Sequence, residues 1–171
     1  MSLTVNDRAN RVATFRFVEV RLMEITAMWT PTTPEMEVKV MFGRHIWDFA
    51  QHADLLGKRT FELRQPEHYT RAPVDAYVAL IDDLAREEDT SARLAALYDG
   101  LLPALADRYR RYLVETDTLL DQPTAVIMER ILTDITRMQR EAQALRSTAG
   151  ARSVPVDDIR ARERAVAEMT A

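Results

Sequence analysis

The run GRHIWDFAQHADLL places two of the chain's three histidines seven residues apart on one predicted helix. Each helical residue advances about 100° around the axis, so His45 and His52 fall within an apolar stripe that contains Phe49. Asp48 lies at the edge of the same stripe. This stretch therefore places two imidazoles and a nearby carboxylate at or beside core positions, where proton transfer and metal binding are the chemistries to consider.

A second carboxylate with an inward position comes from the earlier run FRFVEVRLMEITAMW. Glu19 lies within about 40° of the centre of the stripe formed by Phe15, Leu22 and Trp29. A buried ionised carboxylate is costly unless it is paired or binds a metal. Histidine and carboxylates that converge inside a helical bundle are typical of a metal site. A His–carboxylate pair in an apolar cavity can also transfer protons without metal, because burial and pairing tune both pKa values.

These positions predict that Glu19, His45 and His52 are mostly buried and approach one another across the first and second helices, in catalytic roles. They also predict a metal site formed by Glu19, Asp48 and His52. Positions seven residues apart are separated by about 10 Å along a helix axis, so the two histidines are poorly placed to share one ion. Asp48 could chelate an ion together with either of them. The alternative is that each histidine is a buried hydrogen-bonding group, the more common role of a single core histidine.

Large apolar side chains around these groups predict a substrate pocket. The predicted pocket residues are Phe42, Phe49, Tyr112, Ile135 and Met138. Tyr112 belongs to a set with Tyr98 and Tyr109 that lines one side of a later helix. Tyrosines in such positions are more often core residues with hydroxyl groups at the rim, although they can border a ligand pocket.

The rest of the chain reads as helices that would position these side chains. Only four glycines are present, no strand-like alternation persists, and apolar residues recur at three- and four-residue steps. The predicted fold class is therefore all-α. We expect long helices over residues 10–29, 34–64, 90–116 and 122–147, a shorter helix over 74–88, and a short C-terminal helix. Thr90 or Ser91 is the expected cap of the third long helix, Pro103 its expected kink, and Asp121 the expected cap of the fourth.

The helix order and three runs resemble the ferritin-like superfamily of four-helix bundles over most of residues 10–147. The three runs are FRFVEVRLMEITAMW, FGRHIWDFAQHADLLGKRTFELR and YLVETDTLLDQPTAVIMERILTDITRM. The resemblance implies a ferritin-like four-helix bundle with an extra short helix. In members with a di-iron site, two helices each supply a Glu and two others each supply Glu-x-x-His. Glu19 then corresponds to the first-helix Glu and His52 to the first motif histidine.

The same resemblance implies an incomplete di-iron ligand set. Phe49 stands at the position expected for the Glu that precedes His52. Ile135 and Met138 stand at the corresponding positions on the last long helix. Neither Ile135 nor Met138 is an ordinary iron ligand. Glu115 or Asp134 could contribute from the edges of their stripes, although neither is centred. At most one tightly bound ion is expected, held near the first two helices.

Composition limits the remaining function classes. The 171 residues suit one ordinary domain, with 47% hydrophobic and 29% charged residues. We expect a bundle over residues 1–150, then a linker and a short helix over 151–171. The net charge of −4 gives no broad attraction for nucleic acid, and the absence of cysteine excludes disulfides and thiolate sites. No apolar run suits a membrane span or a secretory signal, so a cytoplasmic location is expected.

Two functions remain open from the sequence. The first is a divergent ferritin-like enzyme of a bacterial small-molecule pathway, for example an oxidoreductase, with a His/carboxylate site in the bundle core. The sequence does not identify a cofactor for this enzyme, although a single divalent ion such as iron, manganese or zinc would suit the site. Its ligand would be a small molecule. The alternative is a non-catalytic ferritin-like bundle that dimerises or binds a partner. A packed interior in which the inward polar groups bond only to one another would favour the alternative.

Overall fold

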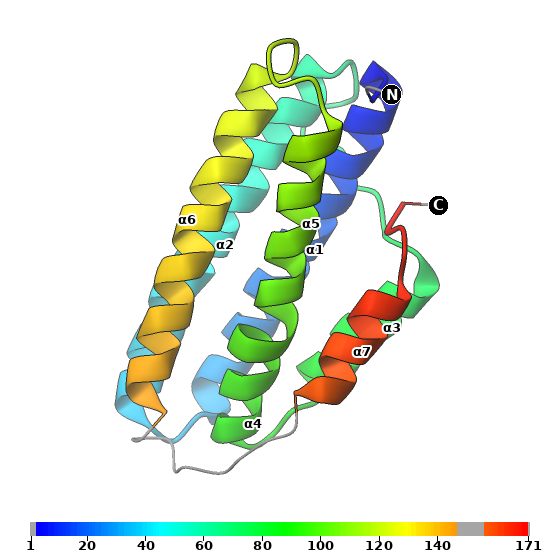
Figure 1. Cartoon of the computed structure of the whole chain (residues 1–171). Helices are drawn as coiled ribbons and strands as arrows, with labels where there is room; N and C mark the ends of the chain where they lie inside the picture. Colours follow the sequence, from blue (N-terminus) through cyan, green and yellow to red (C-terminus); the bar gives the residue numbers. More distant parts are fainter. Residues whose placement is uncertain (1–2, 147–155, 171) are drawn as a thin grey trace.

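The computed structural model describes residues 3–146 and 156–170, which form helices and connecting turns with no strand among them. Four long helical segments lie side by side (Figure 1). They are α1 (Val5–Thr32), α2 (Met36–Glu62), the continuous run of α4 (Thr90–Leu94), η1 (Ala95–Leu101) and α5 (Leu102–Glu115), and α6 (Gln122–Leu145). Two shorter helices, α3 (Asp75–Ala85) and α7 (Asp157–Ala165), pack together beside this group (Figure 1). The all-α prediction is confirmed for the described residues.

Helix α1 begins five residues earlier than the apolar periodicity predicted. Thr4 and Asp7 form a capping box: the Thr4 hydroxyl accepts from the Asp7 backbone at 3.2 Å, and the Asp7 carboxylate accepts from the Thr4 backbone at 3.0 Å. These bonds satisfy backbone donors that have no partner inside the helix. The helix also continues past Trp29 to Thr32, with Pro31 in its last turn.

The third long segment begins at a different cap from the predicted one. Asp89, rather than Thr90 or Ser91, caps α4 by accepting from the Ala92 backbone at 3.0 Å. The π-helical stretch η1 ends just before Pro103, where a kink was predicted. Pro103 lies in the first turn of α5, a position that proline tolerates well.

The turn between α5 and α6 is held by a buried carboxylate. Asp121 occupies the predicted cap position of α6, but its side chain makes no cap hydrogen bond. It accepts instead from Arg59 at 2.8 Å and from the Tyr112 hydroxyl at 2.6 Å. Asp121 thereby ties the last turn of α2 to the ends of α5 and α6.

Helix α7 follows the predicted linker, most of which lies outside the described residues. Arg160 of α7 donates to the Asp99 carbonyl at 3.0 Å, and Arg108 pairs with Glu163. These contacts hold α7 against η1 and α5. Among the described helices, none combines the length and the apolar character needed to cross a membrane.

Candidate functional site

Glu19 of α1 and His52 of α2 meet in the core of the bundle, where both side chains are fully buried. His52 Nδ1 donates to Glu19 Oε2 at 3.0 Å. The Tyr109 hydroxyl of α5 donates to the other carboxylate oxygen, Oε1, at 2.5 Å. Both oxygens of the buried carboxylate therefore have hydrogen-bond donors, which reduces the cost of burying its charge. The prediction that Glu19 and His52 are buried and approach each other is confirmed.

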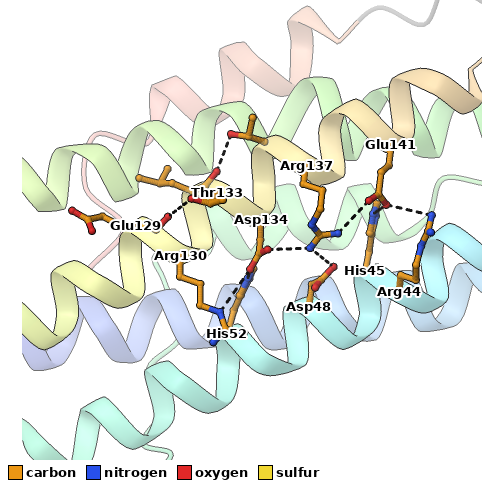
Figure 2. A network of polar contacts seen from close by, with 12 residues as sticks. Arg44, His45, Asp48, His52, Glu129, Arg130, Thr133, Asp134, Arg137 and Glu141 are labelled. Atoms are coloured by element: carbon orange, nitrogen blue, oxygen red, sulfur yellow. Dashed lines mark hydrogen bonds and ion pairs between the residues drawn. The ribbon is translucent and has the colours of Figure 1, made fainter.

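The second ring nitrogen of His52 faces the last long helix. His52 Nε2 donates to Asp134 Oδ2 of α6 at 3.1 Å (Figure 2). Burial disfavours the charged ring, but the charge of Glu19 and the hydrogen bonds with both carboxylates outweigh it. Together they raise the pKa of His52 to about 9. At neutral pH, His52 is an imidazolium between two carboxylates and has no free lone pair.

Asp134 shows the complementary shift. The hydrogen bond from His52, assisted by Arg137, outweighs burial and lowers the pKa of Asp134 to about 2. Arg137 Nη2 lies 3.0 Å from Asp134 Oδ1 and 2.9 Å from Asp48 Oδ2. The charge on His52 is therefore balanced by carboxylates from two neighbouring helices. Arg137 in turn balances the charges of Asp134 and Asp48.

Three charged or polar pairs join α2 and α6 in antiparallel register (Figure 2). They are His52 with Asp134, Asp48 with Arg137, and His45 with Glu141. From His52 back to His45 the steps along α2 are four and three residues, and from Asp134 to Glu141 the steps along α6 are three and four. Both runs span seven residues, about two helical turns, so the two outer pairs face each other and the middle pair is offset by one residue.

His45 takes part in this register but does not reach the Glu19–His52 pair. Its Nε2 donates to Glu141 at 3.0 Å, and its Nδ1 accepts from the Tyr98 hydroxyl at 2.6 Å. Burial outweighs the nearby carboxylate and lowers the pKa of His45, so the ring is neutral. The prediction that His45 is buried is confirmed. The expectation that it would approach Glu19 and His52 was wrong, because Tyr98 and Glu141 occupy both of its nitrogens.

The three predicted metal ligands do not converge. Glu19 and His52 are in contact, whereas Asp48 forms its ion pair with Arg137. Within residues 3–146 and 156–170, no group of three or more His, Cys, Asp or Glu side chains is arranged to hold a metal ion. Metal binding itself stays a prediction, with a donor set smaller than the sequence indicated.

The five residues predicted to line a substrate pocket are all buried in the contiguous apolar core. They are Phe42, Phe49, Tyr112, Ile135 and Met138. Each is at most 1% exposed. The Tyr112 hydroxyl bonds to Asp121 near one end of the bundle rather than to the central polar groups. These side chains pack as core, and a role in ligand binding stays a prediction.

Sequence reasoning missed most of the partners of the inward groups. Tyr98 and Tyr109 were assigned to core packing, and Asp134 was considered only as a stripe-edge residue. A usable signal was present: His-x-x-Asp-x-x-x-His on α2 and Asp-x-x-Arg-x-x-x-Glu on α6 are complementary when read in opposite directions. Opposite charge types over the same seven-residue span on two facing helices predict these pairs.

The outer end of this network reaches the surface beside exposed apolar residues of α2. Met36, Val40 and Trp47 are 65%, 57% and 65% exposed. Shallow hollows lie between them and α6. The hollows are lined by Met36, Glu37, Val40, Gly43, Arg44, Trp47, Asp48, Arg137, Glu141, Ala144 and Leu145. This surface combines three exposed apolar side chains with the solvent-facing part of the α2–α6 pairs.

Comparisons with known protein families, curated proteins and solved structures found no match for this chain. No family is therefore assigned to it. The geometry of the site is the basis for the function considered next.

Proposed function

We propose that this protein is a non-catalytic, ferritin-like four-helix bundle that acts as a dimerisation or partner-binding module. The observation that carries the proposal is that every polar side-chain atom of Glu19 and His52 has a hydrogen-bond partner within the protein. Both oxygens of Glu19 accept hydrogen bonds, and both nitrogens of His52 donate them, all within the protein. These groups therefore have partners without any substrate or ion.

The enzyme hypothesis would need this arrangement to be dismantled. A metal or substrate that binds to His52 must displace one of its hydrogen bonds, and a metal must also remove a proton from the ring. Hydrogen bonds to charged groups contribute about 1.5–3 kcal/mol each. Losing such a bond in a buried site opposes ligand binding, whereas a satisfied network stabilises one packing of the helices.

The ferritin-like assignment within this proposal rests on the order of the helices and on two positions. Glu19 on the first helix and His52 on the second are the residues that such bundles use as ligands. Phe49, Ile135 and Met138 replace other expected ligands with apolar side chains. In such a bundle, Glu19 and His52 would occupy the ligand positions but bind each other, because the remaining ligand positions hold apolar side chains.

Metal analysis tests this proposal. The protein, purified without a histidine tag, should contain well below one equivalent of iron, manganese or zinc. Calorimetric titration with each divalent ion should show no binding that depends on Glu19. The variants for comparison are Glu19→Gln and, as a matched control on the exposed side of the same helix, Glu24→Gln. One equivalent of metal bound by the wild type and by Glu24→Gln, but lost in Glu19→Gln, would overturn the proposal.

A further inference from the structure

We propose that a second copy of this chain docks antiparallel on the exposed stripe of α2. This inference rests on the proposed function and identifies the partner of the module as a second copy of the chain. The stripe comprises Met36, Val40, Gly43 and Trp47, and Ala50 extends it. The spacing of four, three, four and three residues is the heptad repeat by which two helices pack along a seam. The residues that bury the opposite side of α2, such as Phe42 and Phe49, are fully enclosed, so this seam is a second apolar face of the helix.

The stripe is complementary to itself when the two helices run in opposite directions. A two-fold axis between residues 41 and 42 places Met36 opposite Trp47 of the second copy, and Val40 opposite Gly43. Both contacts occur twice because the interface is symmetric. The thioether of Met36 suits the face or edge of an indole ring. Each layer thus pairs a larger side chain with a smaller or more adaptable one.

Gly43 permits the close approach that this packing needs. A Cβ built at Gly43 meets no atom within 4 Å, so the space outside this glycine is open. Val40 of the second copy can occupy that space and bring the helix axes together. A parallel pair would instead stack Gly43 on Gly43 and Trp47 on Trp47, leaving a gap in one layer and crowding the next.

Charges beside the stripe favour the same arrangement. Rotation about the two-fold axis keeps the same edge of both helices together, so Glu37 comes beside Arg44 of the second copy, twice. Arg44 lies 3.4 Å from Glu141 of its own chain, so Glu37 would be its second carboxylate partner. Opposite charges at such flanking positions select partner and orientation in paired helices. In a parallel pair, Lys39 would come beside Arg44 of the second copy. Both antiparallel contacts are attractive, whereas this parallel contact is repulsive.

Trp47 of the second copy also meets a preformed hollow. The antiparallel register places its ring over Met36, next to the hollow bounded by Val40 and by Ala144 and Leu145 of α6. Tryptophan buried in a pocket is a common energetic anchor of protein interfaces. The interface therefore extends from α2 onto the last turns of α6.

Sedimentation equilibrium over a wide concentration range gives the first test. The wild type should form dimers, and Trp47→Glu should weaken dimerisation at least about tenfold. The matched control is Phe61→Glu, on the same helix and similarly exposed at 67%. This substitution should change the dimer dissociation constant less than about twofold. A wild type that stays monomeric, or equal effects of both substitutions, would overturn this inference. Neither result affects the metal test of the proposed function.

Gly43→Gln separates dimerisation from folding. Glutamine favours helix over glycine, and the open space at Gly43 accepts a side chain in the monomer. The variant should therefore melt at or above the wild-type temperature under monomeric conditions, yet lose the dimer because the second copy can no longer approach. A Gly43→Gln protein that dimerises as the wild type does would contradict the proposed contact.

Single cysteines can report the orientation, because the chain has no cysteine of its own. In the antiparallel register, Val40→Cys lies about 4.5 Å along the axis from its own symmetry mate and should cross-link on mild oxidation. Trp47→Cys lies about 17 Å from its mate and should not. A mixture of Met36→Cys and Trp47→Cys proteins should form mixed cross-linked dimers. Cross-linking of Trp47→Cys to itself, with none in the mixture, would show a parallel pair and overturn the assignment.

Discussion

The charge on His52 should make the stability of the folded protein depend on alkaline pH. The pKa of His52 is raised to about 9 in the folded protein, against about 6.5 in an unfolded chain. A difference of about 2.5 pKa units corresponds to about 3 kcal/mol. Because the folded pKa is the higher one, this stabilisation is fully present below about pH 6.5. It is lost progressively as the pH rises to about 9.

Urea unfolding at a series of pH values from 6 to 9.5 measures this dependence. The free energy of unfolding of the wild type should fall with pH by up to about 1.4 kcal/mol per unit between the two pKa values. His52→Gln should be less stable at pH 6 and nearly flat over this range. His68→Gln, which removes a partly exposed histidine, should keep the wild-type slope. A flat wild-type profile, or a slope that persists unchanged in His52→Gln, would refute the charged state assigned to His52.

Two substitutions test the partners of buried charges. Glu19→Gln keeps the shape of the side chain but should lower the pKa of His52 and destabilise the fold by about 1–3 kcal/mol. Thermal melts at pH 5.5 and pH 8 should show a weaker pH dependence than in the wild type, and a more stable variant would contradict the pairing. Arg59→Met leaves Asp121 buried without its cation and should cost about 3–5 kcal/mol in urea unfolding. Arg86→Met removes only an exposed ion pair and should cost at most about 1 kcal/mol, so equal losses would contradict the role of Asp121.

The helical phase of the chain was predictable because periodicity directly reports which side of a helix faces the core. The stripes on the first two long helices placed Glu19, His45 and His52 inside, and all three are fully buried. The start of α1 was also encoded locally, in the Thr4–Asp7 capping box, but the apolar pattern alone did not reveal it.

The partners of the buried groups were harder to predict, because they depend on how one helix is placed along another. From the sequence, Asp48 could face either the predicted metal site or α6. Only the α2–α6 register shows that Asp48 forms an ion pair with Arg137. His45 lies on the same stripe as His52, yet a separation of two helical turns gives it different neighbours. Periodicity within one helix carries no information about these choices.

The central claim, that Glu19 and His52 engage each other rather than a ligand, is tested most directly by nitrogen-15 NMR of the His52 ring. At pH 7.5 both ring nitrogens should carry protons, and their signals should stay unchanged when iron, manganese or zinc is added at one equivalent. Assignment by comparison with His52→Gln identifies the signals. A His52 nitrogen without a proton at this pH, or a His52 signal that shifts or broadens stoichiometrically with metal while those of His45 and His68 do not, would contradict the account.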